Sequence, residues 1–355
     1  MHRISEKYMN RCLQLAKKGE GATKTNPMVG CVIVHNDTII GEGYHRKFGE
    51  AHAEVNAINS VRESSLLKNS TLYVSLEPCS YFGKTPPCAK RIISEQIPRV
   101  VIASTDPNSK VAGKGIQMLR DAGIDVVAGV LEAEAKSLNK VFFVNQLKKR
   151  PYVILKWAQT KDGFIDNRRE SSETPPLKLS NSITQSVVHK LRAQTMSIMV
   201  GTDTALKDNP TLTTRKWYGD NPVRVVIDRT GKLAATSNLF SNDAKTILFT
   251  QLETYPIEKD NLTCIHLNSE DDINRQILNK LFEMNLASVL IEGGTYTLTS
   301  FIEKNLWDEA FVEVADMNIG NGIEAPGMAL NVINAKKYID SFHFHIKREI
   351  SRNYN

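Results

Sequence analysis

The sequence predicts an α/β protein of two domains. Its 355 residues are too many for one typical domain and sufficient for two. In both halves, short β-branched runs of strand length alternate with amphipathic runs of helix length, which is the pattern of α/β domains. A basic segment that ends in proline, 146–151, separates the two patterns, and we interpret its charges as a solvated linker. We therefore predict domains at residues 1–147 and 148–355.

The composition is that of a globular protein in a reducing compartment. Hydrophobic residues make up 41% of the chain, which is enough for packed cores. The longest apolar runs, such as 29–34, are of strand length, and the N-terminus lacks the apolar core of a signal peptide. Five cysteines fit a reducing environment. We therefore expect a cytoplasmic protein without membrane partners, whose oligomeric state, a homo-oligomer included, the sequence leaves open. The net charge of +6 is compatible with phosphorylated small molecules and with nucleic acid and selects neither.

The first half shows apolar periodicity with clear helix and strand ends. Gly19 ends the first helical run, and 35–37 is a turn between two strands. In order, we predict helix 6–18, a strand ending at Val34, strand 38–43, helix 52–61, strand 71–76, helix 88–95, strand 100–104, helix 115–122, strand 125–129 and helix 132–144.

One imidazole and two thiols in this half form a candidate zinc site. They are His52, Cys79 and Cys88, and together they leave the fourth tetrahedral position for water. Glu54 lies two residues from His52, close enough to move protons without binding the metal. His52 and Cys88 both fall at predicted helix starts. The alternative is a structural zinc, which normally recruits a fourth protein ligand, and His45 is the nearest spare candidate.

The order His-x-Glu, Pro-Cys, Cys is that of zinc-dependent base deaminases, but the usual second half is Cys-x-x-Cys. Here the loop 80–87 separates the cysteines. The segments Glu-Pro-Cys-Ser at 77–80, Gly-Lys-Thr-Pro-Pro-Cys at 83–88, Asp-Pro-Asn at 106–108 and Val-Ala-Gly-Lys-Gly at 111–115 resemble the bifunctional deaminase–reductases of riboflavin biosynthesis. The resemblance implies a cytidine-deaminase-like α/β/α sandwich for the first domain.

The resemblance also implies a substrate, 2,5-diamino-6-(5-phosphoribosylamino)pyrimidin-4-one, which loses its ring amino group. Glu54 would be the catalytic proton carrier. Asn26 and Asn108 match positions that bind the pyrimidine, and Lys84 matches a position near the ribose phosphate. Turn formation by the two asparagines and a solvated lysine are the alternatives. Tyr81 departs from the His of many relatives. It can donate a hydrogen bond and stack on a base but cannot become cationic, so we expect altered contacts and retained chemistry.

The second half repeats the alternation of strands and helices. Strand 288–291 is followed by Glu292, two glycines and a helix start. Backbone N–H groups at such a helix start can bind a phosphate. Common Gly-Gly turns are the alternative. In order, we predict strand 152–158, a turn at 162–163, helix 184–194, strand 197–201, a loop at 208–213, strands 223–228, 246–250 and 288–291, and a helix that ends at Lys304.

These segments resemble the reductase half of the same family, which implies a dihydrofolate-reductase-like fold and NADPH as cofactor. The reaction would be hydride transfer to C1′ of the ring-opened ribose. Carried over by position, the substrate contacts are Arg192, Leu212, Arg215 and Glu292, and the two arginines suit a phosphate. The implied cofactor contacts are Ala158, Thr204, Asp208, Gly294, Thr295, Tyr296, Thr297, Leu298, Thr299 and Ser300. Ordinary roles as helix surface, strand cap and turn former are the alternatives for Arg192, Glu292 and Asp208.

Two stretches of the second half depart from this family. Residues 173–178 lack the Gly-Glu-Ser and Trp of many relatives, and 316–355 match only loosely. One competing interpretation is therefore a deaminase with an inactive second domain. A nucleic-acid-editing deaminase calls for a basic surface interleaved with aromatic residues, yet aromatics are only 7% of the chain. A non-enzymatic zinc regulator would not need Glu54.

Overall fold

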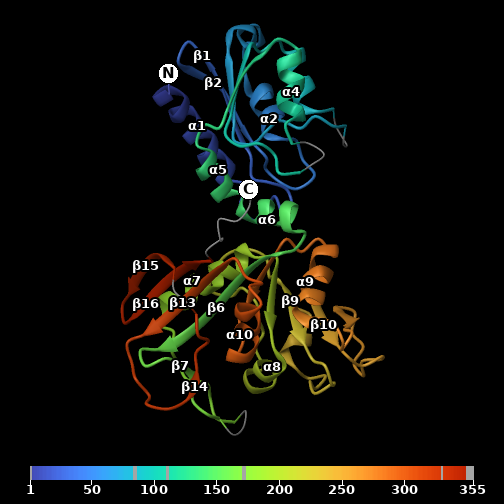
Figure 1. Cartoon of the computed structure of the whole chain (residues 1–355), viewed down its shortest axis with the longest axis vertical. Coiled ribbons are helices and arrows are strands. Elements are labelled where there is room, and N and C mark those ends of the chain that lie inside the picture. The colour runs from blue at the N-terminus through green and yellow to red at the C-terminus, as the bar shows by residue number, and fades with distance from the viewer. Residues whose placement is uncertain (1, 83–85, 109–111, 170–172, 329–330, 349–355) are drawn as a thin grey trace. The chain divides into compact units, whose positions relative to one another are not determined.

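The computed structural model describes residues 2–82, 86–108, 112–169, 173–328 and 331–348. The chain divides into two compact units, Met1–Lys149 and Arg150–Asn355. Both are built from strands and helices in alternation (Figure 1), so the predicted α/β class is confirmed. None of the helices in the described part combines the length and the apolarity that a membrane crossing needs.

The first unit is built on a five-stranded sheet in the order β2-β1-β3-β4-β5. Its strands are β1 Gly30–His35, β2 Thr38–Tyr44, β3 Thr71–Val74, β4 Arg99–Ile102 and β5 Asp125–Ala128. Strand β1 pairs antiparallel with β2 and β3, whereas β3, β4 and β5 run parallel. Because parallel strands end at a common edge, the segments that follow β3 and β4 begin side by side.

Helices cover both faces of this sheet. Cys31 and Ile33 point into a core shared with α2, α3 and α4, whereas Val32 and Val34 alternate into a core shared with α1 and α5. The result is a three-layer α/β/α sandwich. The helices are α1 His2–Lys17, α2 Ala53–Ser60, α3 Cys88–Ser94, α4 Lys114–Asp121, α5 Glu132–Leu138 and α6 Lys140–Lys148, with a 3₁₀ turn at Ser64–Asn69.

The prediction of one helix over 132–144 is wrong, because Asn139 divides it into α5 and α6. The Asn139 side chain accepts a hydrogen bond from the Met28 N–H and donates one to the Met28 carbonyl, both at 2.8 Å. This amide replaces a strand partner for the backbone just before β1. The apolar periodicity of 132–144 carries no sign of this long-range contact.

The second unit contains a nine-stranded sheet in the order β11-β10-β9-β8-β12-β6-β13-β16-β15. In this sheet order, the seven strands from β11 through β13 are parallel to one another, whereas β16 pairs antiparallel with both β13 and β15. The strands are β6 Tyr152–Thr160, β8 Ser197–Val200, β9 Val223–Ile227, β10 Thr246–Thr250, β11 Leu262–His266, β12 Ser288–Ile291, β13 Glu309–Ala315, β15 Val332–Tyr338 and β16 Ser341–Lys347, and β7 Phe164–Asp166 pairs separately with β14 Ile323–Glu324.

Helices α9 and α10 pack on one face of this sheet, over a core that includes Leu155, Val289 and Phe301. Helix α7 lies on the other face, where Ser180, just before it, bonds Glu313 of β13. The helices are α7 Ser182–Gln194, α8 Thr202–Asp208, α9 Ile273–Glu283 and α10 Thr295–Glu303, with a 3₁₀ turn at Asn238–Phe240.

Several elements of the second unit were not predicted from the sequence. They are β7, α8, β11, α9 and the four strands from β13 to β16. Helix α8 has only seven residues, too few to show helical periodicity. Strand β15 is exposed on both faces over six of its seven residues, so its sequence has no alternation to detect.

Candidate active sites

The first candidate site forms where α2, α3 and the segment after β3 meet. His52 is the N-cap of α2 and Cys88 the first residue of α3, as predicted. His52 Nδ1 lies 3.7 Å from Cys79 Sγ and 3.4 Å from Cys88 Sγ. Tetrahedral zinc with ordinary bond lengths separates nitrogen and sulfur ligands by about 3.6 Å, so the three atoms are spaced for this ion.

Contacts among these three groups shift the pKa values of all of them. The Cys88 thiol and its backbone N–H both point at Cys79 Sγ, which lowers the pKa of Cys79 to about 4 and raises the pKa of Cys88. The same thiolate raises the pKa of His52 to about 9. Zinc binds cysteine as the thiolate and histidine as the neutral imidazole, so binding of the ion at this site would release protons.

Glu54 lies in the first turn of α2 and is only 3% exposed. Burial raises the pKa of its carboxyl above the ordinary range. A carboxyl held beside the metal ligands is placed to exchange protons with a group bound there.

His45 does not join the metal ligands. Among the described residues, the only cluster of His, Cys, Asp and Glu with metal-binding spacing is His52, Cys79 and Cys88. His45 is buried, with Nδ1 3.2 Å from the Ala51 carbonyl and Nε2 3.1 Å from the Asn26 amide nitrogen. Because a carbonyl only accepts, Nδ1 donates and Nε2 accepts from Asn26. The His45 ring meets the His52 ring edge-on at 5.6 Å, so His45 fixes Asn26 near the metal ligands.

The other predicted deaminase contacts lie around the same edge. Asp106 and Asn108 follow β4, and the Asp106 carboxylate accepts the Asn108 N–H at 2.8 Å. Burial raises the pKa of Asp106 to about 6. Tyr81 is 51% exposed, and burial followed by the charge of Cys79 raises its pKa. Lys84 lies outside the described residues.

The second candidate site brings together the four predicted substrate contacts of the other unit. Arg192 of α7 and Glu292, at the end of β12, form a two-point ion pair of 2.7 and 3.2 Å. Their side chains are 12% and 13% exposed. Burial is the largest single influence and raises the pKa of Glu292, but the charge and hydrogen bonds of Arg192 and the neighbouring charges together lower it. Lys156 of β6 acts on Glu292 in the same direction.

The loop 211–215 is tied to this ion pair at several points. Arg192 donates to the Thr213 carbonyl at 3.2 Å, and the Arg215 N–H donates to His189 Nδ1 at 3.0 Å. Fully buried Arg224 donates to the Thr211 carbonyl at 2.9 Å. Leu212 is buried at φ +53°, a backbone conformation that needs such support.

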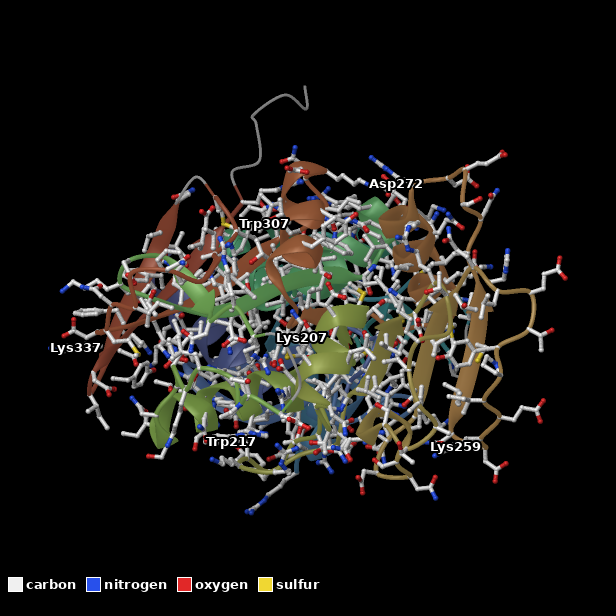
Figure 2. The ribbon with its side chains drawn as sticks, turned by 90° about the horizontal axis from the view of Figure 1, so that it is seen from below. Lys207, Trp217, Lys259, Asp272, Trp307 and Lys337 are labelled. Atoms are coloured by element: carbon white, nitrogen blue, oxygen red, sulfur yellow. The ribbon has the colours of Figure 1, made fainter. Side chains whose placement is uncertain are left out.

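The predicted cofactor contacts gather less completely. The Thr204 hydroxyl accepts the Gly294 N–H at 3.0 Å, which joins α8 to the N-terminus of α10. Asp208 is paired with Arg169, which also bonds Asp166 at 2.7 Å. Lys207 and Trp217, labelled in Figure 2, mark the end of α8 and the loop after Arg215.

Not every residue of 294–300 faces this region with its side chain. Leu298 is fully buried in the core, and Ser300 accepts a hydrogen bond from Asn274 of α9. Thr295 donates to the Glu324 carbonyl, and Tyr296 is 85% exposed. Ala158 lies on β6 opposite Glu313 of β13.

Two known families match the two units. The cytidine and deoxycytidylate deaminase zinc-binding region matches residues 2–104, and the RibD C-terminal domain matches residues 151–333. The riboflavin biosynthesis protein RibD of Aquifex aeolicus is 39% identical over 333 residues, 93% of this chain and 92% of its own. RibD of Bacillus amyloliquefaciens is 40% identical over 92% of this chain and 88% of its own.

The chain belongs to the RibD family. A solved structure agrees with this assignment over the whole fold. It is a diaminohydroxyphosphoribosylaminopyrimidine deaminase/5-amino-6-(5-phosphoribosylamino)uracil reductase from Thermotoga maritima, with a TM-score of 0.88 and 37% identity, and the match covers 98% of this chain and 99% of the other. RibD of Acinetobacter baumannii is similar too, with a TM-score of 0.86, 30% identity and the same coverage.

Membership in the RibD family confirms the predicted function and fold. The protein is a bifunctional deaminase and reductase of riboflavin biosynthesis, with a cytidine-deaminase-like zinc domain followed by a dihydrofolate-reductase-like domain. The weak match of 316–355 and the altered loop 173–178 therefore do not remove the chain from the family.

The structure adds residues to these RibD sites that sequence reasoning did not single out. His189 lies within the predicted helix 184–194, where no pattern marks it, yet burial and the neighbouring arginines lower its pKa to about 4. Glu77 was noted only as part of a motif. Its carboxylate binds the backbone N–H groups of Asp106 and Gly113, which lie 29 and 36 positions further along the chain. No local pattern reveals such a contact.

Proposed function

We propose that the first unit deaminates 2,5-diamino-6-(5-phosphoribosylamino)pyrimidin-4(3H)-one. We propose further that the second unit uses NADPH to reduce the ribosyl group of 5-amino-6-(5-phosphoribosylamino)uracil to ribityl. These substrates are phosphorylated small molecules, as the name of the Thermotoga maritima relative indicates for that protein. The observation that carries the proposal is the zinc-spaced His52, Cys79 and Cys88 with buried Glu54 beside them. The division of the chain near Lys149 supports assigning the two activities to residues 1–147 and 148–355.

In the deaminase unit, His52, Cys79 and Cys88 would hold zinc. Zinc, when bound, would lower the pKa of a water molecule, so that a hydroxide nucleophile is available for attack on the ring at neutral pH. Glu54 accepts the proton of that water, returns it to the ring nitrogen and assists the departure of ammonia. Its raised pKa suits both transfers.

Side chains around Glu54 would select the pyrimidine. His45 accepts from the Asn26 amide nitrogen, which leaves the Asn26 carbonyl oxygen to accept a hydrogen bond from the ring. Asn108 would bind the ring from the segment after β4, and Lys84 would bind the phosphate.

In the reductase unit, a basic region suits a phosphorylated substrate. Arg215 would bind the phosphate, while Arg192, oriented by Glu292, and buried Leu212 would position the rest of the molecule. NADPH, when bound, supplies the hydride that ends on C1′. These side chains hold the ribose carbon in place for that transfer.

The residues proposed for NADPH fit an anionic cofactor in one respect. The start of α10 follows a parallel strand, and its first N–H groups form a favourable end for phosphate. Gly201 permits a close approach of α8, because a Cβ there would lie 2.5 Å from Thr297 Oγ1. The proposed contacts are Ala158, Thr204, Asp208, Gly294, Thr295, Tyr296, Thr297, Leu298, Thr299 and Ser300, with Leu298 acting through its backbone.

The test uses zinc-loaded protein and the diaminopyrimidine phosphoriboside, with and without NADPH, followed by mass spectrometry. We expect exchange of the amino group for oxygen without NADPH and a further gain of two hydrogens with it. Deamination alone would restrict the proposal to the first unit. No reaction in either tube, with zinc shown to be bound, would contradict the proposed substrate.

A further inference from the structure

Glu77 follows β3 and is buried, with a carboxylate that collects four backbone N–H groups. Oε1 accepts from Gly115 at 2.9 Å and Ile116 at 3.2 Å. Oε2 accepts from Gly113 at 2.9 Å and Asp106 at 3.2 Å. All four donors belong to the segment that joins β4 to the first turn of α4. A negative side chain at this helix start is favourable as well.

Other contacts bring the same two segments together. The Glu77 N–H donates to the Ser104 carbonyl at 2.9 Å. A Cβ on Gly115 would lie 2.0 Å from the Pro78 carbonyl oxygen, so only glycine permits this approach. Gly113 is at φ +76°, which also favours glycine. The start of α4 is thus seated directly on the backbone that leads to Cys79.

The contacts of Glu77 continue to the proposed pyrimidine contact. Glu77 binds the Asp106 N–H, and the Asp106 carboxylate in turn accepts the Asn108 N–H at 2.8 Å. The Asn108 carbonyl accepts from Ala112 at 2.8 Å. Asn108 is therefore held between two points that both depend on the segment bound by Glu77.

We infer that Glu77 is a positioning residue that sets the affinity of the deaminase for its pyrimidine by fixing Asn108. The inference rests on the proposed role of Asn108 in binding the substrate. The four hydrogen bonds of the Glu77 carboxylate all go to backbone N–H groups. The metal ligands His52 and Cys88 begin α2 and α3, and neither is among the groups that the Glu77 carboxylate binds.

Glu77→Gln replaces the carboxylate by an amide with little change in side-chain volume, so it tests the carboxylate alone. In wild type, each carboxylate oxygen of Glu77 accepts two N–H groups. In the variant, the amide nitrogen of glutamine replaces one of these oxygens, and as a donor it would face two other donors. The segment must shift to relieve this opposition. A shift of Asn108 weakens ground-state binding, which raises KM and leaves kcat nearly unchanged. A purely structural role predicts the reverse, namely fewer active molecules with an unchanged KM.

The experiment compares wild type and Glu77→Gln in the full chain for zinc content, deaminase kinetics and NADPH-dependent reduction. We expect full zinc, a deaminase KM raised about tenfold or more and a kcat within about threefold. Full zinc content shows that the first unit is folded, and unchanged reduction of the deaminated substrate shows that the second unit is folded. Asp228→Asn is the matched control, because Asp228 is a buried carboxylate that accepts the N–H groups of Lys232 and Leu233 in the other unit. Its deaminase KM should equal that of wild type.

Two further variants keep the test decisive. Asn108→Ala should raise KM, and adding Glu77→Gln to it should raise KM no further. If Glu77→Gln loses zinc, Gly113→Ala disturbs the same segment more gently and should still raise KM. A fall in kcat at unchanged KM, or additive effects in the double variant, would overturn the inference. Absence of deamination in wild type would instead overturn the proposed function.

Discussion

The two units of this protein assemble their candidate sites over very different distances in the sequence. In the deaminase unit, the outermost metal ligands are 36 positions apart, and the three ligands lie at two helix starts and in the segment after β3. In the reductase unit, Arg192 and Glu292 are 100 residues apart, and the loop between them is held by Arg224 and His189. A site whose residues lie close together in the sequence can be recognised from a motif. A site whose residues are far apart is recognised mainly from the folded structure.

The difference extends to the chemistry. The deaminase site places one buried acid beside three metal ligands, and we propose that this single group carries the proton transfers. The reductase site has paired charges and backbone clamps. We propose that its contribution is the orientation of substrate and cofactor. Substitution of the buried acid should therefore act on kcat, whereas substitution of the paired charges should act on binding or local stability.

The largest expected effect tests the single-acid side of this comparison. Glu54→Gln should lower the deaminase kcat by about 10²–10⁴-fold, because the amide cannot carry the proton. Zinc content and NADPH-dependent reduction should equal those of wild type, measured by metal analysis and by absorbance of the cofactor. Retained deamination would mean that another group moves the proton.

The second test breaks the long-range pair of the reductase unit. Glu292→Gln leaves the half-buried Arg192 charge unpaired, which should destabilise this unit by about 3 kcal/mol and raise its substrate KM. Calorimetry and reductase kinetics measure the two effects. Adding Arg192→Met should recover part of the stability but not the binding. Deaminase rates equal to that of wild type in both variants serve as the control.

The third test concerns the pH dependence of the reductase unit. The folded pKa of His189, about 4, lies below its ordinary value of 6.5, so the neutral ring is the form that the fold requires. The stability that this neutral ring contributes is present above pH 6.5 and is lost as pH falls toward 4. The reductase unit should melt at lower temperature over this window. His189→Asn offers an oxygen to the Arg215 N–H without titrating, and should show a shallower decline. An unchanged pH profile in this variant would assign the decline to other groups.

The smallest expected effect lies at the exposed rim of the deaminase site. Tyr81→His should change the substrate KM by a few-fold, about 0.2–1 kcal/mol for a half-exposed contact, with the deamination product unchanged. Steady-state kinetics with the diaminopyrimidine measures the change. If neither turnover nor affinity moves, Tyr81 has no role in binding.

Much of the deaminase unit could be predicted because its signals are local. The chemistry of His52, Glu54, Cys79 and Cys88 is written in residue type and spacing, and apolar periodicity located its strands and all of its helices except the break at Asn139. The reductase unit was harder. Its C-terminal strand β15 is exposed on both faces and shows no alternation, and α8 is too short for a period.

The sequence by itself determined the α/β class, the two-part organisation, the zinc ligands and the RibD-like chemistry. Only the tertiary structure decided which side chains support the sites through hydrogen bonds. His45 binds Asn26, Asn139 binds the Met28 backbone, and Glu77 binds the segment that leads into α4. His189 and Arg224 bind the loop 211–215. The physical reason is that reactive groups are identified by their chemistry. Their supports are ordinary polar side chains, whose partners are chosen by the folded backbone rather than by neighbours in the chain.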